Sequence, residues 1–144
     1  MTKPTHVLAA TDGSDPAERA IDLAAEIARA AGARMTILTV EGELSPQEMR
    51  ALVHAEGDAA AALDAQAHGV LADAARRARS LGVAELSTRI ALGDPAEAIL
   101  EAVRRDVDLL VLGRRGRGRL SGLLLGSVSQ KLVSLAPCAV AVVP

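Results

Sequence analysis

Residues 107–130 read VDLLVLGRRGRGRLSGLLLGSVSQ, and this stretch decides the fold. It opens with a nearly continuous apolar run over 107–112, which is typical of a strand buried on both faces of a parallel sheet. Five glycines follow between 113 and 127. The sequence Ser127-Val128-Ser129-Gln130 then predicts a capping box, with Ser127 at the start of the final helix. A strand, a glycine-rich loop and a helix in this order indicate one unit of an α/β fold.

Four other stretches are rich in β-branched and apolar residues, and each is separated from the next by a helical pattern. They cover residues 7–11, 35–40, 85–92 and Ala139–Val143. The run over 85–92 alternates polar and apolar residues, which predicts a strand at the edge of the sheet. Five strands alternating with helices predict an α/β fold with a doubly wound parallel sheet. We expect one domain over residues 1–144.

Proline-containing helix starts occur three times in the chain. They read Asp15-Pro16-Ala17-Glu18, Ser45-Pro46-Gln47-Glu48 and Asp94-Pro95-Ala96-Glu97. In each, the first side chain can cap the helix, the proline occupies the first helical position and the glutamate favours the positive end of the helix. We therefore predict Asp15, Ser45 and Asp94 as N-caps.

Sequence patterns also predict the extent of the helices and the faces that they bury. The segment after 46 is too long for one helix in a compact domain, so we expect a break near Gly57 and a main helix over 59–81. Gly32 is the expected stop of the first helix, and the last helix must end before Pro137. The two predicted core stripes are Ala20, Ala24, Ile27, Ala28 and Ala31, and Ala96, Ile99, Leu100 and Val103.

Composition excludes several classes of protein. The 144 residues carry a net charge of −2 and no Phe, Tyr or Trp, so we expect no nucleic-acid partner. The single cysteine, Cys138, excludes an internal disulfide, and we interpret it as a small buried hydrophobe. No apolar run approaches the roughly 20 residues that a membrane span requires, and we find no secretory segment at the start. We expect a cytoplasmic protein with no membrane partner.

The segment 113–127 has the features of a phosphate-binding site. Its glycines allow close approach of the main chain to a ligand, and the helix start at Ser127 offers free amides and a positive dipole end. Four arginines lie between Arg114 and Arg119. Two other interpretations stay open, a solvated Arg- and Gly-rich surface loop and an RNA-binding tract. The segment contains no P-loop, no GxGxxG and no GxSxG motif.

The glycine spacing itself is a family signature. Gly113, two residues, Gly116, nine residues and then Gly126-Ser127 fit the pattern G-x2-G-x9-G-[S/T], and the chain resembles the universal stress protein family along its whole length. The resemblance implies a Rossmann-like fold with strand order 3-2-1-4-5 flanked by four helices. It also implies ATP binding and a homodimer paired through Ala139–Val143.

The same resemblance implies roles for individual residues. Asp12 would lie at the ribose, and Val40 would contact adenine through its backbone. Gly113 and Gly116 would line the ribose and phosphates. The phosphates themselves would be held by Gly126, Ser127 and the amide of Val128, with Ser129 joining. Ala10, Thr11, Leu112 and Arg115 complete the expected contacts. Asp12 with Asp15 could help to hold Mg²⁺ on the nucleotide, although a cap role for Asp15 is favoured.

These observations favour a dimeric, ATP-responsive regulatory module of the stress response. One alternative is a slow ATP hydrolase, because residues 11–15 faintly echo the loop of related ATP pyrophosphatases; with no evident base to activate water, we expect at most slow hydrolysis. The other is a dimerisation or interaction module that needs no nucleotide. We identify no catalytic residue and no metal site of the protein's own.

Overall fold

The apolar runs form a parallel sheet in the order β3-β2-β1-β4-β5 in a computed structural model of the chain. The structure describes every residue except 1, 42–46, 48–49, 52–53, 55–58 and 115–124. The observed order of the strands confirms the predicted order 3-2-1-4-5 and places the third strand at an edge of the sheet, as expected. The strands are β1 (His6–Ala10), β2 (Arg34–Glu41), β3 (Leu86–Leu92), β4 (Leu109–Gly113) and β5 (Ala139–Val143).

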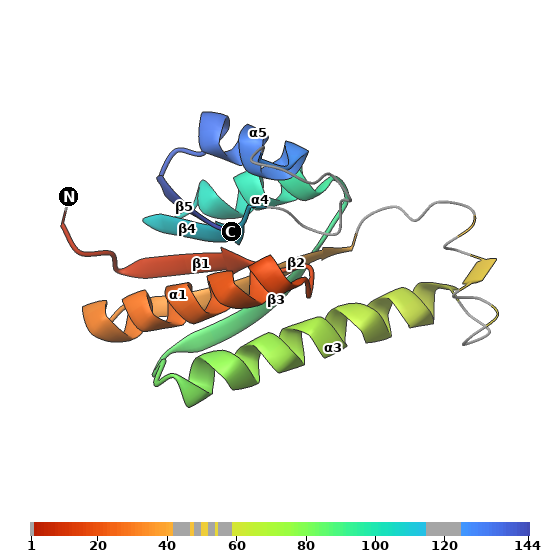
Figure 1. Ribbon diagram of the computed structural model, residues 1–144, viewed down its shortest axis with the longest axis horizontal. Helices are drawn as coiled ribbons and strands as arrows, with labels where there is room; N and C mark the ends of the chain where they lie inside the picture. The colour runs from red at the N-terminus through yellow and green to blue at the C-terminus, as the bar shows by residue number, and fades with distance from the viewer. Residues whose placement is uncertain (1, 42–46, 48–49, 52–53, 55–58, 115–124) are drawn as a thin grey trace.

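Helices cover both faces of the sheet, as Figure 1 shows. On one face α1 (Asp15–Ala31) packs over β1 and β4, and α3 (Ala59–Ser80) packs over β2 and the edge strand β3. On the other face lie α4 (Pro95–Val103) and α5 (Ser127–Leu135). The described residues therefore form the predicted α/β fold, with four helices around five strands.

Strand β1 lies in the middle of the sheet, and its residues alternate between the two cores. Val7 and Ala9 face the α1 and α3 side, whereas Leu8 and Ala10 face the α4 and α5 side. All of β1 is buried. This explains why its sequence is apolar at nearly every position instead of alternating.

The predicted core stripes of the two helices are largely confirmed. Ala20, Ala24 and Ala28 of α1 are at most 1% exposed, while Ile27 and Ala31 pack at the border of the same cluster. The four predicted residues of α4 are all buried. Gly32 ends α1 with φ +66°, a backbone conformation that favours glycine.

Two of the predicted helix starts are wrong by one residue. Ser14, and not Asp15, caps α1: its side chain accepts a hydrogen bond from the Ala17 amide at 3.4 Å. The amide of Ser14 is held by Asp12, so the helix begins one residue earlier than the proline pattern predicts. Helix α5 is likewise capped by Gly126, and Ser127 is its first helical residue.

Other predicted boundaries agree with the structure. Asp94 caps α4 by accepting from the Glu97 amide at 3.0 Å. The main helix over 59–81 is α3, and α5 ends at Leu135, before Pro137. The predicted cap at Ser45 and the break near Gly57 lie outside the described residues. No helix in the described ranges is both long and apolar enough to span a membrane.

Candidate functional site

The carboxyl ends of β1 and β4 form the place where the order of the strands reverses. These two strands are paired neighbours in the sheet, with Ala9 opposite Val111. The chain leaves β1 toward the face with α1 and β4 toward the face with α5. In doubly wound folds this topology places a ligand crevice at the carboxyl ends of the two strands. Ligands of such folds bind at this point, and most of the predicted binding residues lie at the same edge of the sheet.

The turn after β1 is held by its own backbone and side chains. The Thr11 amide donates to the Leu38 carbonyl at 2.9 Å, which continues the pairing with β2 for one residue. The Thr11 hydroxyl accepts from the Gly13 amide at 3.1 Å, and Asp12 Oδ1 accepts from the Ser14 amide at 2.9 Å. Gly13 has φ +82°, which explains the glycine. The turn thus presents Asp12 in a fixed position at the start of α1.

Gly113, the last residue of β4, lies against the start of α1. A Cβ atom at this position would stand 2.9 Å from two atoms of Pro16 and 3.0 Å from the Ala17 amide nitrogen. Real Cβ atoms do not come this close to backbone, so glycine is required here for packing between a helix and a strand. The family signature thus includes at least one glycine with a structural role of its own.

The two ends of the glycine-rich segment are tied together. The Gly126 amide donates to the Arg114 carbonyl at 2.9 Å, and the Arg114 amide donates to the Val143 carbonyl on β5. Ser129 is 3% exposed, and its hydroxyl lies 2.9 Å from the Gly113 carbonyl and 3.0 Å from that of Arg114. The end of β4 is therefore bound directly to the first turn of α5.

The first turn of α5 has the form of an anion-binding helix start. Its cap, Gly126, has extended backbone and no side chain that could accept from the amides that follow. Ser127 is exposed, and Val128 is partly buried against the core on this side. A helix start of this kind, with its amides and positive dipole end, is suited to a phosphate group.

Apart from Gly113, the predicted site residues that the structure describes fall into three groups. Ala10, Leu112, Val40 and Val128 come together in the core cluster on the α4 and α5 side, at or near the carboxyl edge. Thr11 and Asp12 lie in the turn just beyond β1, while Gly126, Ser127 and Ser129 form the start of α5. Arg115 and Gly116 lie outside the described residues.

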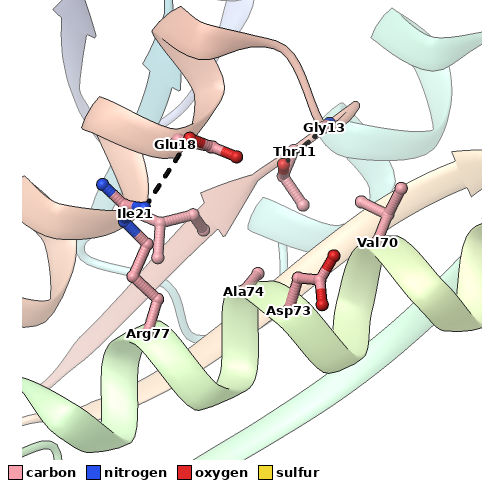
Figure 2. Close-up of a pocket in the computed structure, with 8 residues that line it drawn as sticks. All are labelled: Thr11, Gly13, Glu18, Ile21, Val70, Asp73, Ala74 and Arg77. Carbon is pink, nitrogen blue, oxygen red and sulfur yellow. Dashed lines mark hydrogen bonds and ion pairs between the residues drawn. The ribbon is translucent and has the colours of Figure 1, made fainter.

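A pocket lies between α1 and α3, next to the Thr11–Gly13 turn (Figure 2). Its volume is about 230 Å³. Arg77 of α3 lies at its rim and pairs with Asp22, at 2.5 and 2.9 Å, and with Glu18 at 3.6 Å. Hydrogen bonding to Asp22 and the charges of both carboxylates raise the pKa of Arg77. The lining residues are Thr11, Gly13, Glu18, Ile21, Val70, Asp73, Ala74 and Arg77.

The sequence places Glu41 at this edge of the sheet but predicts no role for its side chain. Glu41 ends β2, and its Oε1 atom is buried with no hydrogen-bond partner among the described residues. A buried carboxylate oxygen without a donor is unusual in a folded protein. Sequence patterns do not reveal it, because a glutamate after an apolar strand is ordinarily solvated.

Metal ligands are not grouped in the described part of the chain. No set of three His, Cys, Asp or Glu side chains there is placed to hold an ion. Asp15, considered with Asp12 as a Mg²⁺ ligand, is an exposed residue at the first helical position of α1.

The chain is similar in sequence and in fold to known proteins. The universal stress protein family model matches residues 4–144. The Thermus aquaticus protein named universal stress protein in QAH/OAS sulfhydrylase 3'region is 38% identical over 142 residues, which cover 95% of this chain and 96% of that protein. A crystal structure of a universal stress protein in complex with cAMP has a TM-score of 0.76 and 31% identity, covering 99% of both chains. The universal stress protein from Archaeoglobus fulgidus in complex with dAMP has the same fold, with a TM-score of 0.69 and 23% identity over 100% of both chains.

Proposed function

Since the chain belongs to the universal stress protein family, we propose that it binds an adenine nucleotide, ATP, at the carboxyl edge between β1 and β4. One observation carries the proposal: the glycine-capped start of α5 is fastened to the end of β4, and β4 is paired with β1, the strand that leads into the Asp12 turn. Helix-start amides suit phosphate, and a carboxylate suits the hydroxyl groups of a ribose.

The proposed contacts follow the order of groups along a nucleotide. Val40, at the end of β2, lies beside the adenine and contacts it through its backbone. Asp12 lies at the ribose, and the amides of Ser127 and Val128 hold the phosphates. The cAMP complex of the 31% identical relative supports an adenine nucleotide as the ligand class. The triphosphate is favoured by the glycine signature of residues 113–127.

We propose that Mg²⁺ accompanies the triphosphate when ATP is bound. The described residues offer no dedicated group of ligands for it. Mg²⁺ commonly keeps several waters and is held through one or two carboxylates and substrate phosphates. Its part would be to neutralise phosphate charge, while the chain's own residues hold the base, the ribose and the phosphates.

We further propose that the protein is a homodimer that acts as a regulatory module of the stress response. Strand β5 lies at one edge of the sheet, and all five of its residues are apolar. An apolar edge without charge or proline invites pairing with a second strand. The same observation favours a second candidate, a dimerisation module that works without nucleotide.

Equilibrium dialysis with labelled ATP tests the binding. We expect saturable binding by the natural chain and its loss in Ser127→Glu, because the added carboxylate repels phosphate while suiting the start of a helix. Ser134→Glu places the same charge at the far end of α5 and should bind normally. Absence of saturable binding at millimolar ATP contradicts the proposal. If the chain binds no nucleotide and still forms a dimer, the second candidate is supported.

A further inference from the structure

Ser129 differs from the other hydroxyl residue at the start of α5. Ser127 is exposed, whereas Ser129 is 3% exposed and points inward, toward the end of β4. Its hydroxyl lies within hydrogen-bond distance of two carbonyl oxygens, 2.9 Å from Gly113 and 3.0 Å from Arg114. A hydroxyl has one proton to donate, and here both neighbours are acceptors. The donor of Ser129 is thus committed to the main chain.

The two carbonyls lie where the chain leaves β4 for the glycine-rich segment. The Arg114 carbonyl also accepts from the Gly126 amide, at the other end of that segment. Ser129 therefore strengthens a junction between the last residues before the segment and the first turn of the helix after it. On the far side the junction continues to β5, through the bond from the Arg114 amide to Val143.

We infer that Ser129 is a positioning residue for the phosphate end of the nucleotide. This inference rests on the proposed function. Ser129 sets the place of the α5 amides relative to the end of β4, and so relative to the Asp12 turn beside it. The hydroxyl contacts no phosphate itself. Loss of this bond leaves the base and ribose contacts in place and loosens the phosphate contacts.

Loss of the Ser129 hydroxyl should weaken binding only of ligands that carry phosphate groups. In Ser129→Ala we expect ATP to bind about three- to tenfold more weakly, the range that one lost hydrogen bond gives. Adenosine, which has no phosphate, should change by less than about twofold. Ser129→Thr keeps the hydroxyl and should restore the natural ratio of the two affinities. Ser134→Ala, which removes an exposed hydroxyl from the same helix, should match the natural chain.

Isothermal titration of ATP and adenosine into the four proteins measures this ratio. Equal weakening of both ligands indicates a structural role only and overturns the inference, as does unchanged ATP affinity. If Ser129→Ala does not fold, Ser129→Cys replaces it, because a thiol fills the space but donates weakly. The circular dichroism spectrum of each variant shows whether it is folded.

A second measurement keeps the inference separate from the proposed function. Hydrogen exchange of the Gly126 amide in the nucleotide-free protein reports the junction directly, because that amide is bonded to Arg114. We expect its exchange to be about fivefold faster or more in Ser129→Ala than in the natural chain. If the natural chain binds neither ligand, the proposed function fails while this comparison still tests the junction. An unchanged exchange rate removes the basis for the inference.

Discussion

Gly113 shows how one residue can belong to a functional signature for a structural reason. Its missing Cβ makes room for Pro16 and Ala17, the first turn of α1. We expect Gly113→Ala to lower the free energy of unfolding by about 1–3 kcal/mol, because backbone must shift to admit the methyl group. Chemical denaturation followed by circular dichroism measures the loss.

Gly69 provides the matched control for that substitution. It lies inside α3, and a Cβ there meets nothing within 4 Å. Gly69→Ala should therefore raise the free energy of unfolding by about 0.5–1 kcal/mol, since alanine has the higher helix propensity. Equal effects of the two substitutions would mean that the contact with Pro16 does not explain Gly113.

Cys138 is partly buried and packs at the border of the α4 and α5 core. Burial raises the pKa of its thiol, so less thiolate is present at neutral pH. We expect alkylation by iodoacetamide to be slower in the folded protein than in the same chain unfolded in urea. The midpoint of the rate against pH should also be higher for the folded protein. A faster reaction in the folded state would instead indicate an activated thiol.

For single residues, the sequence shows which positions matter better than it shows which residues they contact. Glycine at 113 and serine at 129 were both singled out, but their neighbours in space come from α1 and β4 and cannot be read from local spacing. Glu41 shows the same limit, because the lack of a partner depends on everything packed around its side chain. The adenine, ribose and phosphate roles came from resemblance and stay predictions.

The caps of α1 and α4 differ in the length of their hydrogen bonds. Asp94 accepts from the Glu97 amide at 3.0 Å, whereas Ser14 accepts from Ala17 at 3.4 Å. We expect Asp94→Ala to cost about 1 kcal/mol of stability and Ser14→Ala less. Asp15→Ala should cost only a few tenths of a kcal/mol, because Asp15 acts only through the helix dipole. Urea denaturation of the three variants gives the order, and a larger loss for Asp15→Ala than for Ser14→Ala would restore the cap that the sequence predicts.

Strands and helices were predictable because their signals are local. The bounds of β5 and the course of α3 agree with the predicted elements, since apolar runs and the stops beside them lie in the sequence itself. The starts of α1 and α5 were each misplaced by one residue for a nonlocal reason. At α1 the Asp12 carboxylate accepts a hydrogen bond from the Ser14 amide, which fixes Ser14 as the cap. At α5 the Gly126 amide donates to the Arg114 carbonyl, which fixes Gly126 as the cap.

Across the whole molecule, one carboxylate links the amino ends of two central strands. Asp108, just before β4, accepts from the Thr5 amide and hydroxyl, both at 2.7 Å, and from the His6 amide at 2.8 Å. The Thr5 hydroxyl, followed by the two amides, lowers the pKa of Asp108. The folded state therefore holds this proton less tightly than the unfolded state does. The stabilisation is complete above the unfolded pKa, near 4, and is lost as the pH falls through the folded pKa.

Asp108→Asn tests this dependence. We expect the variant to be less stable than the natural chain at pH 7 and to show a weaker fall in stability below about pH 4. Asp64→Asn removes a carboxylate from an exposed position of α3 and controls for the change in net charge. Urea denaturation at a series of pH values measures both slopes. Identical slopes for the natural chain and Asp108→Asn would exclude Asp108 as a source of acid sensitivity.

The outer edge of β5 is where we propose that the molecule meets a second copy. The Val143 carbonyl faces β4, because it accepts from the Arg114 amide at 2.6 Å. Backbone groups of alternate residues in a strand point to opposite sides, so those of Ala141 also face β4 and those of Val140 face outward. Proline at an outward position of an edge strand is tolerated by the sheet, whereas at an inward position it removes a bond of the ladder.

The two positions separate pairing from folding. Val140→Pro should leave the fold intact and shift the proposed dimer to monomer, because the outward amide is lost. Ala141→Pro should lower the melting temperature, because the lost amide belongs to the bond with β4. Sedimentation velocity at micromolar concentration, with a thermal melt of each protein, distinguishes the two effects. A Val140→Pro variant that remains dimeric would move the interface away from β5.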